Sequence, residues 1–322
     1  MKSITPWREI IVDERGHAVR LDAYLALVIK GFSRRRAQGF IQAGEITVNG
    51  RRARKGDPLR AGDAVAVWSR PEAGPWLPLP DPKIAFAVLL EEPAFLAVDK
   101  PSGVASVPLD PGEPGTLAGA IAARYPECAA LGRSSGDGGL LQRLDRGTSG
   151  VVLVARSAEA FDRLFAAQRR GEIEKTYVAL VAAPAQPLPA MIDAPLAGAG
   201  KGRAVVAVNP SGAPAATLVR AVTPLGAFAL VEVAIHSGAR HQIRAHLAHV
   251  GHPIVGDKMY GPDESLFLEY IETGLTEELA RRAGHGRQAL HAAALELVHP
   301  FTKEPLRIES PLPEDIAGLM RG

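Results

Sequence analysis

A proline-rich run divides the chain near the end of its first quarter. Five of the thirteen residues from 70 to 82 are proline. Each proline fixes its own φ, removes a backbone donor and biases the preceding residue toward extended structure. Such a run is typical of a semi-rigid linker and not of a helix or a central strand. We therefore expect a first domain over residues 1–72, a linker over 73–82 and a second domain over 83–322.

The two predicted domains differ in charge. Residues 1–70 contain 14 lysines and arginines against 7 acidic residues, whereas the rest of the chain contains 23 against 28. A basic head on a mildly acidic body indicates a module that binds a polyanion, and a solvated basic face is the alternative. The single cysteine, Cys128, cannot form an internal disulfide, and neither a long apolar run nor a signal-peptide pattern occurs. We expect a cytoplasmic protein that does not span a membrane.

Apolar spacing in the first domain predicts two helices and a small sheet. Leu21, Tyr24, Leu25 and Val28 recur at helical spacing, and Ser33 is suited to cap a second helix. Residues 45–48 alternate as a strand, residues 49–50 are an Asn-Gly hairpin signal, and residues 64–68 form a further strand.

Basic side chains gather at the start of the second predicted helix and after the hairpin signal. Arginines at a helix N-terminus suit phosphate groups, because the first backbone N–H groups of the helix point the same way. The residues that we predict to contact the phosphates of a polyanion in this domain are Arg34, Arg35, Arg36, Arg51 and Lys55.

This stretch resembles the alpha-L RNA-binding domain of the ribosomal protein S-four family. The resemblance covers about fifty residues, and it implies binding to structured RNA through shape and phosphate contacts. The matching residues are Arg20-Leu21-Asp22, Ser33-Arg34, Ile41, Ala43-Gly44, Val48-Asn49-Gly50 and Gly62-Asp63.

The second domain alternates apolar strands with a few helices. We predict strands over 95–98, 150–155, 176–181 and 228–235, and helices over 158–169 and 240–250. The spacing is too irregular for repeated βαβ units. We therefore predict an α+β fold, in which helices pack on a mixed, mostly antiparallel sheet.

The densest chemical signal is the run from Leu141 to Gly150. Asp145 lies between Arg143 and Arg146, in a loop rich in turn formers just before a buried strand. Two neighbouring arginines favour the ionised carboxylate, which suits a nucleophile or a general base. An aspartate that caps the turn or forms a structural ion pair is the alternative on local chemistry.

Together with several later segments, this run resembles the RluA-type pseudouridine synthases, which isomerise uridine in RNA. The similarity spans roughly residues 95–315. The segments that carry it are Asp99 to Gly103, Arg143-Leu144-Asp145, Thr148-Ser149-Gly150, Lys175 to Val181, His241 to Leu247, Gly251 to Gly261, Leu290-His291-Ala292 and His299 to Thr302.

The resemblance implies specific roles for the matched residues. Asp145 would start cleavage of the uridine N1–C1′ bond, Tyr177 would stack on the base, and Arg244 would pair with Asp145. Arg143 could fill the space left by a flipped uridine, and Arg146 would add an RNA contact. The family implies no cofactor and no metal, a monomer, and ribosomal RNA of the large subunit as partner, with tRNA as the alternative.

Three departures from the family pattern affect the expected RNA contacts. Gln142 stands where histidine is common, Gly147 where an acidic residue is common, and Arg240 lies one place later than the usual arginine. The first two favour a second hypothesis, an RNA-binding or ribosome-assembly factor without catalysis. An unrelated hydrolase with Asp145 as nucleophile is a third hypothesis, with no oxyanion-forming motif to accompany it.

Two weaker patterns indicate no further site. The glycine-rich run at 198–202 lacks the Lys-Ser/Thr ending of a phosphate-binding loop, so we expect a hairpin loop there. The histidines near 241–252 lack carboxylate or cysteine partners at ligand spacing, so we expect no metal.

Overall fold

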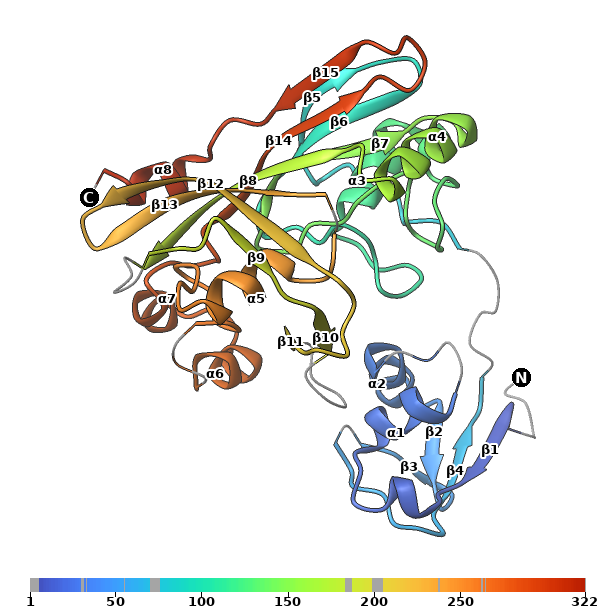
Figure 1. Cartoon of the computed structure of the whole chain (residues 1–322). Coiled ribbons are helices and arrows are strands. Elements are labelled where there is room, and N and C mark those ends of the chain that lie inside the picture. Colours follow the sequence, from blue (N-terminus) through green and yellow to red (C-terminus); the bar gives the residue numbers. More distant parts are fainter. Residues whose placement is uncertain are drawn as a thin grey trace. The chain divides into compact units, whose positions relative to one another are not determined.

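The chain folds as two units, each with its own sheet and its own hydrophobic core (Figure 1). The computed structural model describes residues 6–29, 32, 34–54, 56–69, 76–182, 187–198, 205–236, 238–261, 263 and 265–321. The first unit contains residues 1–76 and 109–113, and the second contains residues 77–108 and 114–322. Residues 73–75 of the predicted linker lie outside the described residues.

The first unit packs two helices on a four-stranded antiparallel sheet of strand order β1-β4-β2-β3. Its elements are β1 (Arg8–Ile11), the 3-10 helix η1 (Glu14–Gly16), α1 (Leu21–Val28), α2 (Arg34–Gln42), β2 (Ile46–Val48), β3 (Arg51–Arg52) and β4 (Ala64–Val67). The predicted hairpin turn joins β2 to β3, and both Asn49 and Gly50 have positive φ, 50° and 75°. Ser33, the predicted helix cap, lies outside the described residues.

The second unit contains the remaining elements. They are β5 (Ala87–Glu91), β6 (Phe95–Lys100), α3 (Leu117–Arg124), the 3-10 helix η2 (Pro126–Cys128), β7 (Ser149–Ala155), α4 (Ala158–Arg169), β8 (Glu174–Ala182), β9 (Met191–Asp193), β10 (Leu196–Gly198), β11 (Val206–Val208), β12 (Ala216–Leu225), β13 (Phe228–Ile235), α5 (Gln242–His249), α6 (Ser265–Thr273), α7 (Glu277–Ala283), β14 (Leu290–Val298), β15 (Pro305–Glu309) and α8 (Glu314–Leu319).

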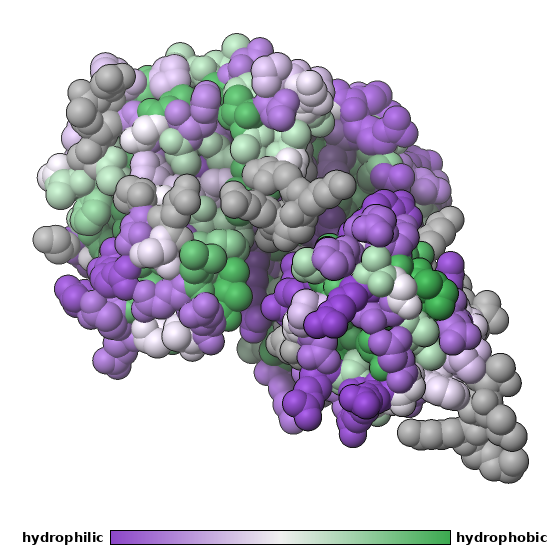
Figure 2. Space-filling view, turned by 90° about the horizontal axis from the view of Figure 1, so that it is seen from below, coloured by the Kyte–Doolittle hydropathy of each residue, from purple (hydrophilic) through white to green (hydrophobic). Residues whose placement is uncertain are grey.

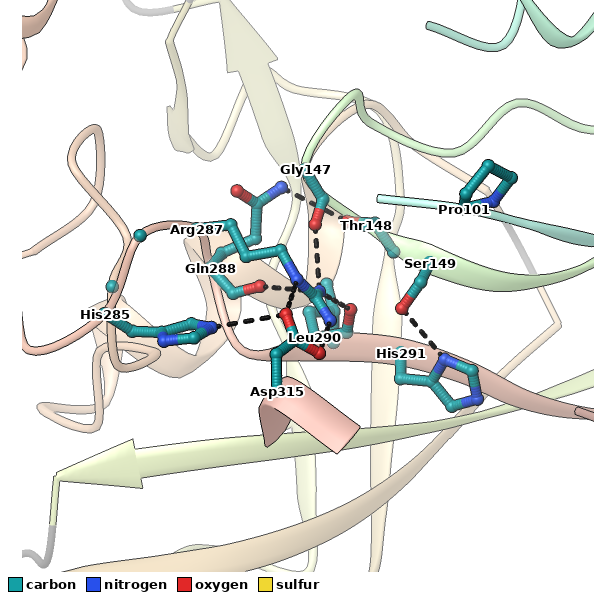
Figure 3. A network of polar contacts seen from close by, with 12 residues as sticks. Pro101, Gly147, Thr148, Ser149, His285, Arg287, Gln288, Leu290, His291 and Asp315 are labelled. Carbon is teal, nitrogen blue, oxygen red and sulfur yellow. Dashed lines mark hydrogen bonds and ion pairs between the residues drawn. The ribbon is translucent and has the colours of Figure 1, made fainter. Parts of the chain in front are cut away.

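One large sheet dominates the second unit. Its strand order is β5-β6-β7-β14-β8-β13-β12-β9, with β15 paired to β14. Every pairing is antiparallel except β7 with β14, where Ser149 lies opposite His291. The two side chains also bond, Ser149 Oγ to His291 Nδ1 at 3.0 Å (Figure 3). The predicted fold class, helices on a mixed and mostly antiparallel sheet, is confirmed.

The parallel pairing places the loop before β7 beside the start of β14. Gly150 makes this close approach possible, because a Cβ there would overlap the backbone of Ala292 and its φ is +117°. Strand β8 pairs with β14 on the other side, so Tyr177 lies opposite Ala292. Residues from three distant parts of the sequence are therefore brought to one end of neighbouring strands.

Two predicted elements differ in detail from the structure. Helix α5 begins at Gln242, two residues later than predicted, because His241 adopts a left-handed conformation with φ of 54°. The short strands β10 and β11 pair as the expected hairpin, although residues 199–204 of its loop lie outside the described residues.

The face seen from below is mostly hydrophilic, with smaller apolar patches between the polar side chains (Figure 2).

Candidate active site

Asp145 lies in the irregular loop that leads into β7, and the segment after β6 holds this loop. Ser106 binds the backbone of Leu144 twice, since its Oγ donates to the carbonyl at 2.7 Å and accepts from the amide at 2.9 Å. Gly103 N–H donates to the Arg146 carbonyl at 2.8 Å, and Arg146 Nε donates to the Gly103 carbonyl at 2.7 Å. The backbone on both sides of Asp145 is therefore fixed.

A buried lysine strengthens the same connection. Lys100 ends β6, and its Nζ donates to the carbonyl groups of Pro101 at 2.8 Å, Val104 at 2.7 Å and Arg146 at 3.5 Å. Burial lowers the pKa of Lys100 to about 7, and the charge of Asp145 opposes this shift. The segment from Asp99 to Gly103, which contains Lys100, thus supports the loop of Asp145.

The other side of the loop is held by a polar network (Figure 3). Arg287 Nη1 donates to the Gly147 carbonyl at 3.0 Å, and Asp315 of α8 grips the same guanidinium at 2.6 and 2.8 Å. Gln288 Nε2 donates to Thr148 Oγ1 at 3.2 Å. A Cβ at position 147 would overlap the Gln288 amide, which gives a steric reason for glycine at this departure from the family pattern.

Arg244 of α5 lies between two carboxylates. Its Nη1 donates to Asp145 Oδ2 at 2.7 Å, and its Nε and Nη2 donate to Asp257 at 2.6 and 2.9 Å. Burial alone would lower the pKa of Arg244, but the hydrogen bonds and charge of Asp257, followed by the charge of Asp145, raise it. Arg244 is therefore a permanent cation that stabilises the ionised Asp145.

Asp257 fixes Arg244 in its turn. Its side chain is fully buried, and its Oδ1 also accepts the amides of Met259 at 2.9 Å and Tyr260 at 3.0 Å. Burial would raise the pKa of Asp257, but the hydrogen bonds and charge of Arg244 and these two amides lower it overall. The guanidinium also lies over the Tyr260 ring, 5.0 Å from its centroid.

The second oxygen of Asp145 faces a histidine. His241 Nε2 lies 3.6 Å from Asp145 Oδ1, and His241 Nδ1 lies 3.0 Å from the Tyr260 hydroxyl. That hydroxyl already accepts the amide of Val206 at 2.8 Å, so its proton is available to His241 Nδ1. With this tautomer the Nε2–H points toward Asp145. Burial lowers the pKa of His241 to about 4, and the positive charges of Arg244 and Arg240 act in the same direction.

Tyr177 lies on β8, in the core of the second unit, with 8% of its surface exposed. Burial raises the pKa of Tyr177, and the negative charge of Asp145 raises it further. The hydroxyl is therefore neutral over the ordinary working range, and the side chain lies within electrostatic reach of the aspartate. The structure thus brings Asp145, Tyr177 and Arg244 together.

The other residues predicted near Asp145 lie at its margins. Arg143 and Arg146 are exposed, which leaves the free end of Arg143 available to a ligand. The Gln142 amide is buried, with no hydrogen-bond partner among the described residues. Arg240 is exposed next to His241.

The basic residues predicted to bind RNA in the first unit are mostly at its surface. Arg34, Arg35 and Arg51 are exposed, Arg36 is half-buried, and Lys55 lies outside the described residues. Arg34 also donates to the buried Asp22 carboxylate at 3.3 Å, so it links α2 to α1 as well as facing solvent.

Several residues of the site had no role in the sequence analysis. They are Lys100, His241, Asp257, Tyr260 and Arg287. Asp257 and Tyr260 could have been found as an acidic and an aromatic residue in a turn-forming Gly-Asp-Lys-Met-Tyr-Gly run. Arg287 lies in a segment without any recognisable pattern.

Two of the histidines set aside as metal ligands, His241 and His246, make other contacts. His246 uses both ring nitrogens, with Thr217 Oγ1 at 2.8 Å and the Ala194 carbonyl at 2.9 Å. Within the described ranges, no three histidine, cysteine or acidic side chains converge as a metal site. The helices described there are also too short or too polar to cross a membrane.

Both units of the chain are similar in sequence to known proteins. The family model for RNA pseudouridylate synthase matches residues 94–249, and the S4 domain model matches residues 19–65. Ribosomal large subunit pseudouridine synthase D of Xanthomonas campestris pv. campestris is 36% identical, over 97% of this chain and 91% of that protein. The protein of that name from Pseudomonas aeruginosa is 33% identical, over 94% of this chain and 91% of the other.

Two solved human structures share the fold. Human RNA Pseudouridylate Synthase Domain Containing 4 has a TM-score of 0.54 at 20% identity, covering 73% of this chain and 91% of that one. Human RNA Pseudouridylate Synthase Domain Containing 1 has a TM-score of 0.51 at 24% identity, covering 70% and 83%. Fold and sequence together define an enzyme that modifies RNA. The chain belongs to the RNA pseudouridine synthase family, with an S4 RNA-binding domain before its catalytic region.

Proposed function

We propose that this enzyme converts defined uridines of large-subunit ribosomal RNA to pseudouridine, and that Asp145 starts the reaction. The names of the bacterial relatives support the choice of RNA. The observation that carries the role of Asp145 is its hydrogen bond from Arg244 at 2.7 Å, which engages Oδ2 and leaves Oδ1 for chemistry. A carboxylate held in this way points in one direction, as a nucleophile or base requires.

The reaction is an isomerisation. The bond from uracil N1 to ribose C1′ breaks, a bond from C5 to C1′ forms, C5 loses a proton and N1 gains one. No electrons are transferred to another molecule, so the chemistry requires no redox cofactor. Asp145 could attack C1′ or remove the 2′ proton, and both routes use its ionised carboxylate.

The base must remain bound while it is detached. We assign the stacking surface to Tyr177, because it lies opposite Ala292, which pairs with Gly150 at the start of β7, and within electrostatic reach of Asp145. We assign Arg143 to the space left by the flipped uridine, since it is exposed next to Asp145 and its planar guanidinium can stack on bases. Arg146, exposed on the other side, would contact the RNA backbone.

The first domain would raise affinity without reading sequence. We propose that residues 1–72 bind structured RNA, that residues 73–82 link the domains, and that residues 83–322 catalyse. Arg34, Arg35, Arg36, Arg51 and Lys55 would contact phosphates. A chain starting at Ile84 should bind ribosomal RNA more weakly and with a smaller salt dependence. An unchanged salt dependence would contradict the assignment.

We further propose that the enzyme acts as a monomer in the cytoplasm. Asp145, Tyr177 and Arg244 all come from one unit of one chain, so no second copy has to complete the site. Sedimentation of the purified protein with and without RNA tests the monomer.

Mapping of pseudouridine in total RNA tests the function. Cells without the gene would be complemented with the wild type, Asp145→Asn or the control Asp162→Asn, an exposed aspartate on α4. We expect defined sites in large-subunit ribosomal RNA to disappear and to return with the wild type and the control only. Loss of sites in tRNA instead would identify tRNA as the substrate. An unchanged map, with RNA binding intact, would favour an assembly factor without catalysis.

A further inference from the structure

Among the described residues of the second unit, three lysines are buried, and two of them are tied to backbone carbonyl groups. Lys100 donates to three carbonyls beneath the loop of Asp145. Lys258 donates to the carbonyls of Gly256 at 3.0 Å, His285 at 2.9 Å and Gly286 at 2.6 Å. Both ammonium groups therefore serve the fold by joining loops, and their donor capacity is filled.

The third lysine differs from these two. Lys175 lies on β8 with 2% of its surface exposed, yet its ammonium has no hydrogen-bond acceptor or acidic partner among the described residues. Burial lowers the pKa of Lys175 to about 8. A buried cation without a partner costs free energy, and an apolar side chain would fill the position at less cost. The charge is therefore explained better by a ligand than by the fold.

The position of Lys175 relates it to the candidate active site. Lys175 and Tyr177 are two residues apart on one strand, so they share a face and lie roughly 6.6 Å apart along it. The Lys175 Nζ lies beneath the exposed Gly238, where a Cβ would be 3.6 Å away. Three residues further on, His241 lies against Asp145. Lys175 thus shares the strand face of Tyr177, to which we assign the target base, and its ammonium lies under Gly238.

We propose that Lys175 binds a backbone phosphate of the RNA at the target nucleotide, an inference that rests on the proposed function. If the base stacks on Tyr177 and the ribose lies at Asp145, a phosphate of the target nucleotide or of its neighbour can reach Lys175. An ammonium on a flexible stem meets a phosphate as a point charge and needs no bidentate geometry. The phosphate supplies the partner that the free enzyme lacks.

Salt dependence of RNA binding distinguishes this role from a structural one. Each phosphate contact adds roughly 0.7 to 0.9 to the slope of log affinity against log salt concentration. Binding would be measured with transcribed large-subunit ribosomal RNA in an Asp145→Asn background, so that turnover does not interfere. The variants are Lys175→Met, Lys175→Arg and Gly238→Val, with Lys258→Met as the matched buried control.

We expect Lys175→Met to weaken binding about tenfold and to lower the slope by roughly one. Lys175→Arg should keep the slope. Gly238→Val, which removes no charge, should lower the slope because it covers the ammonium. Lys258→Met should lower the melting temperature and leave the slope unchanged. If Lys175→Met left the slope unchanged, the proposal would be wrong, whatever happened to stability.

Two further comparisons ensure that each result has a single interpretation. If Lys175→Met did not fold, Lys175→Arg and Gly238→Val would still decide, since a slope unaffected by the valine overturns the proposal. With active enzyme, Lys175→Met should act mainly on KM. An absence of pseudouridine formation by the wild type would instead contradict the proposed function, and the binding slopes would remain a separate test of Lys175.

Discussion

Arg244 meets Asp257 through two parallel hydrogen bonds, 2.6 Å and 2.9 Å long, on the side of the guanidinium away from Asp145. A fork held in this way cannot rotate, so its remaining nitrogen has one direction in which to donate. Asp257 is therefore the residue that aims Arg244 at the aspartate, although it is not itself in contact with Asp145. Burial would raise the pKa of Asp257, but Arg244 and the two backbone donors lower it overall and keep the carboxylate ionised.

Asp257→Asn should consequently reduce turnover more than RNA binding. Asparagine keeps the shape but loses the charge, so Arg244 is less firmly oriented. We expect kcat to fall roughly a hundredfold, because small displacements of catalytic groups have effects of this size. Loss of a buried ionic partner should also lower the free energy of unfolding by about 3 kcal/mol. Single-turnover kinetics and urea unfolding measure the two effects.

The control for this variant is Asp263→Asn. Asp263 is exposed and pairs with Arg282 at 3.1 Å, so asparagine at this position should leave stability nearly unchanged. A kcat for Asp257→Asn within threefold of wild type would contradict the aiming role.

His241 should make the protein sensitive to acid. Its folded pKa, about 4, lies below its ordinary value of 6.5, so the unfolded chain binds its proton more readily. The free energy of unfolding must then fall as pH decreases from about 6.5 to about 4, and the loss is complete below the folded pKa. His241→Asn should reduce this loss by up to about 3 kcal/mol at pH 4.

Urea unfolding of both proteins at several pH values between 7.5 and 4 measures the difference. Other buried histidines with a lowered pKa contribute to acid sensitivity in both proteins, and so cancel. The charged groups acting on His241 are Asp145, Arg244, Arg240 and Asp257. Parallel pH profiles for wild type and variant would show that His241 is not held neutral.

The sequence predicted the parts of this molecule that follow from local pattern. Residues 141–150 identified the loop of Asp145, and the Asn-Gly signal at 49–50 placed a hairpin turn. The resemblance placed Asp145 near Arg244, 99 positions apart, and the structure brings the two together. Local pattern alone contains no information on such a separation.

Support from other elements could not be predicted in the same way. Arg287 holds the Gly147 carbonyl from 140 positions away, and Asp315 holds Arg287. Both are charged residues in polar segments, where pattern indicates solvent exposure. Strand β1 is exposed at three of its four positions, so it lacks the alternation of buried and exposed residues from which a strand is predicted. Such contacts depend on tertiary position, which apolar periodicity does not encode.

Arg287 and Asp315 should act as one unit in holding the loop of Asp145. Asp315→Ala frees the guanidinium, and Arg287→Met removes the donor from the Gly147 carbonyl. We expect each to lower kcat about tenfold and the double variant to lower it little further, because residues in one network are not additive. Arg287→Met should be the less stable, since it leaves carbonyl groups without a donor.

A double-mutant cycle on kcat and on unfolding free energy measures this coupling. Glu314→Ala is the control, because Glu314 is the exposed neighbour of Asp315 on α8 and pairs with Arg321. Additive effects of Arg287→Met and Asp315→Ala would show that the two residues work separately.

Alanine should cost much more stability at Gly150 than at Gly147, the two glycines that flank Thr148 and Ser149. At Gly150 the new Cβ would overlap the Ala292 backbone, and the φ of +117° disfavours any side chain. Neither strand can shift without breaking the parallel pairing of β7 and β14, so Gly150→Ala should cost more than about 2 kcal/mol. At Gly147 the obstacle is the end of the Gln288 side chain, which can rotate away. Gly147→Ala should cost less than about 1 kcal/mol.

Alanine at Gly147 should affect activity for a reason separate from stability. Gly147→Ala displaces the Gln288 amide from Thr148, so it should lower kcat by several-fold even though the protein remains stable. Gln288→Ala combined with Gly147→Ala should then be no worse than Gln288→Ala alone, because the space is already vacated. Melting temperatures and turnover of the four variants test both statements. Equal destabilisation by alanine at 147 and 150 would mean that Gln288 is as rigid as the sheet backbone.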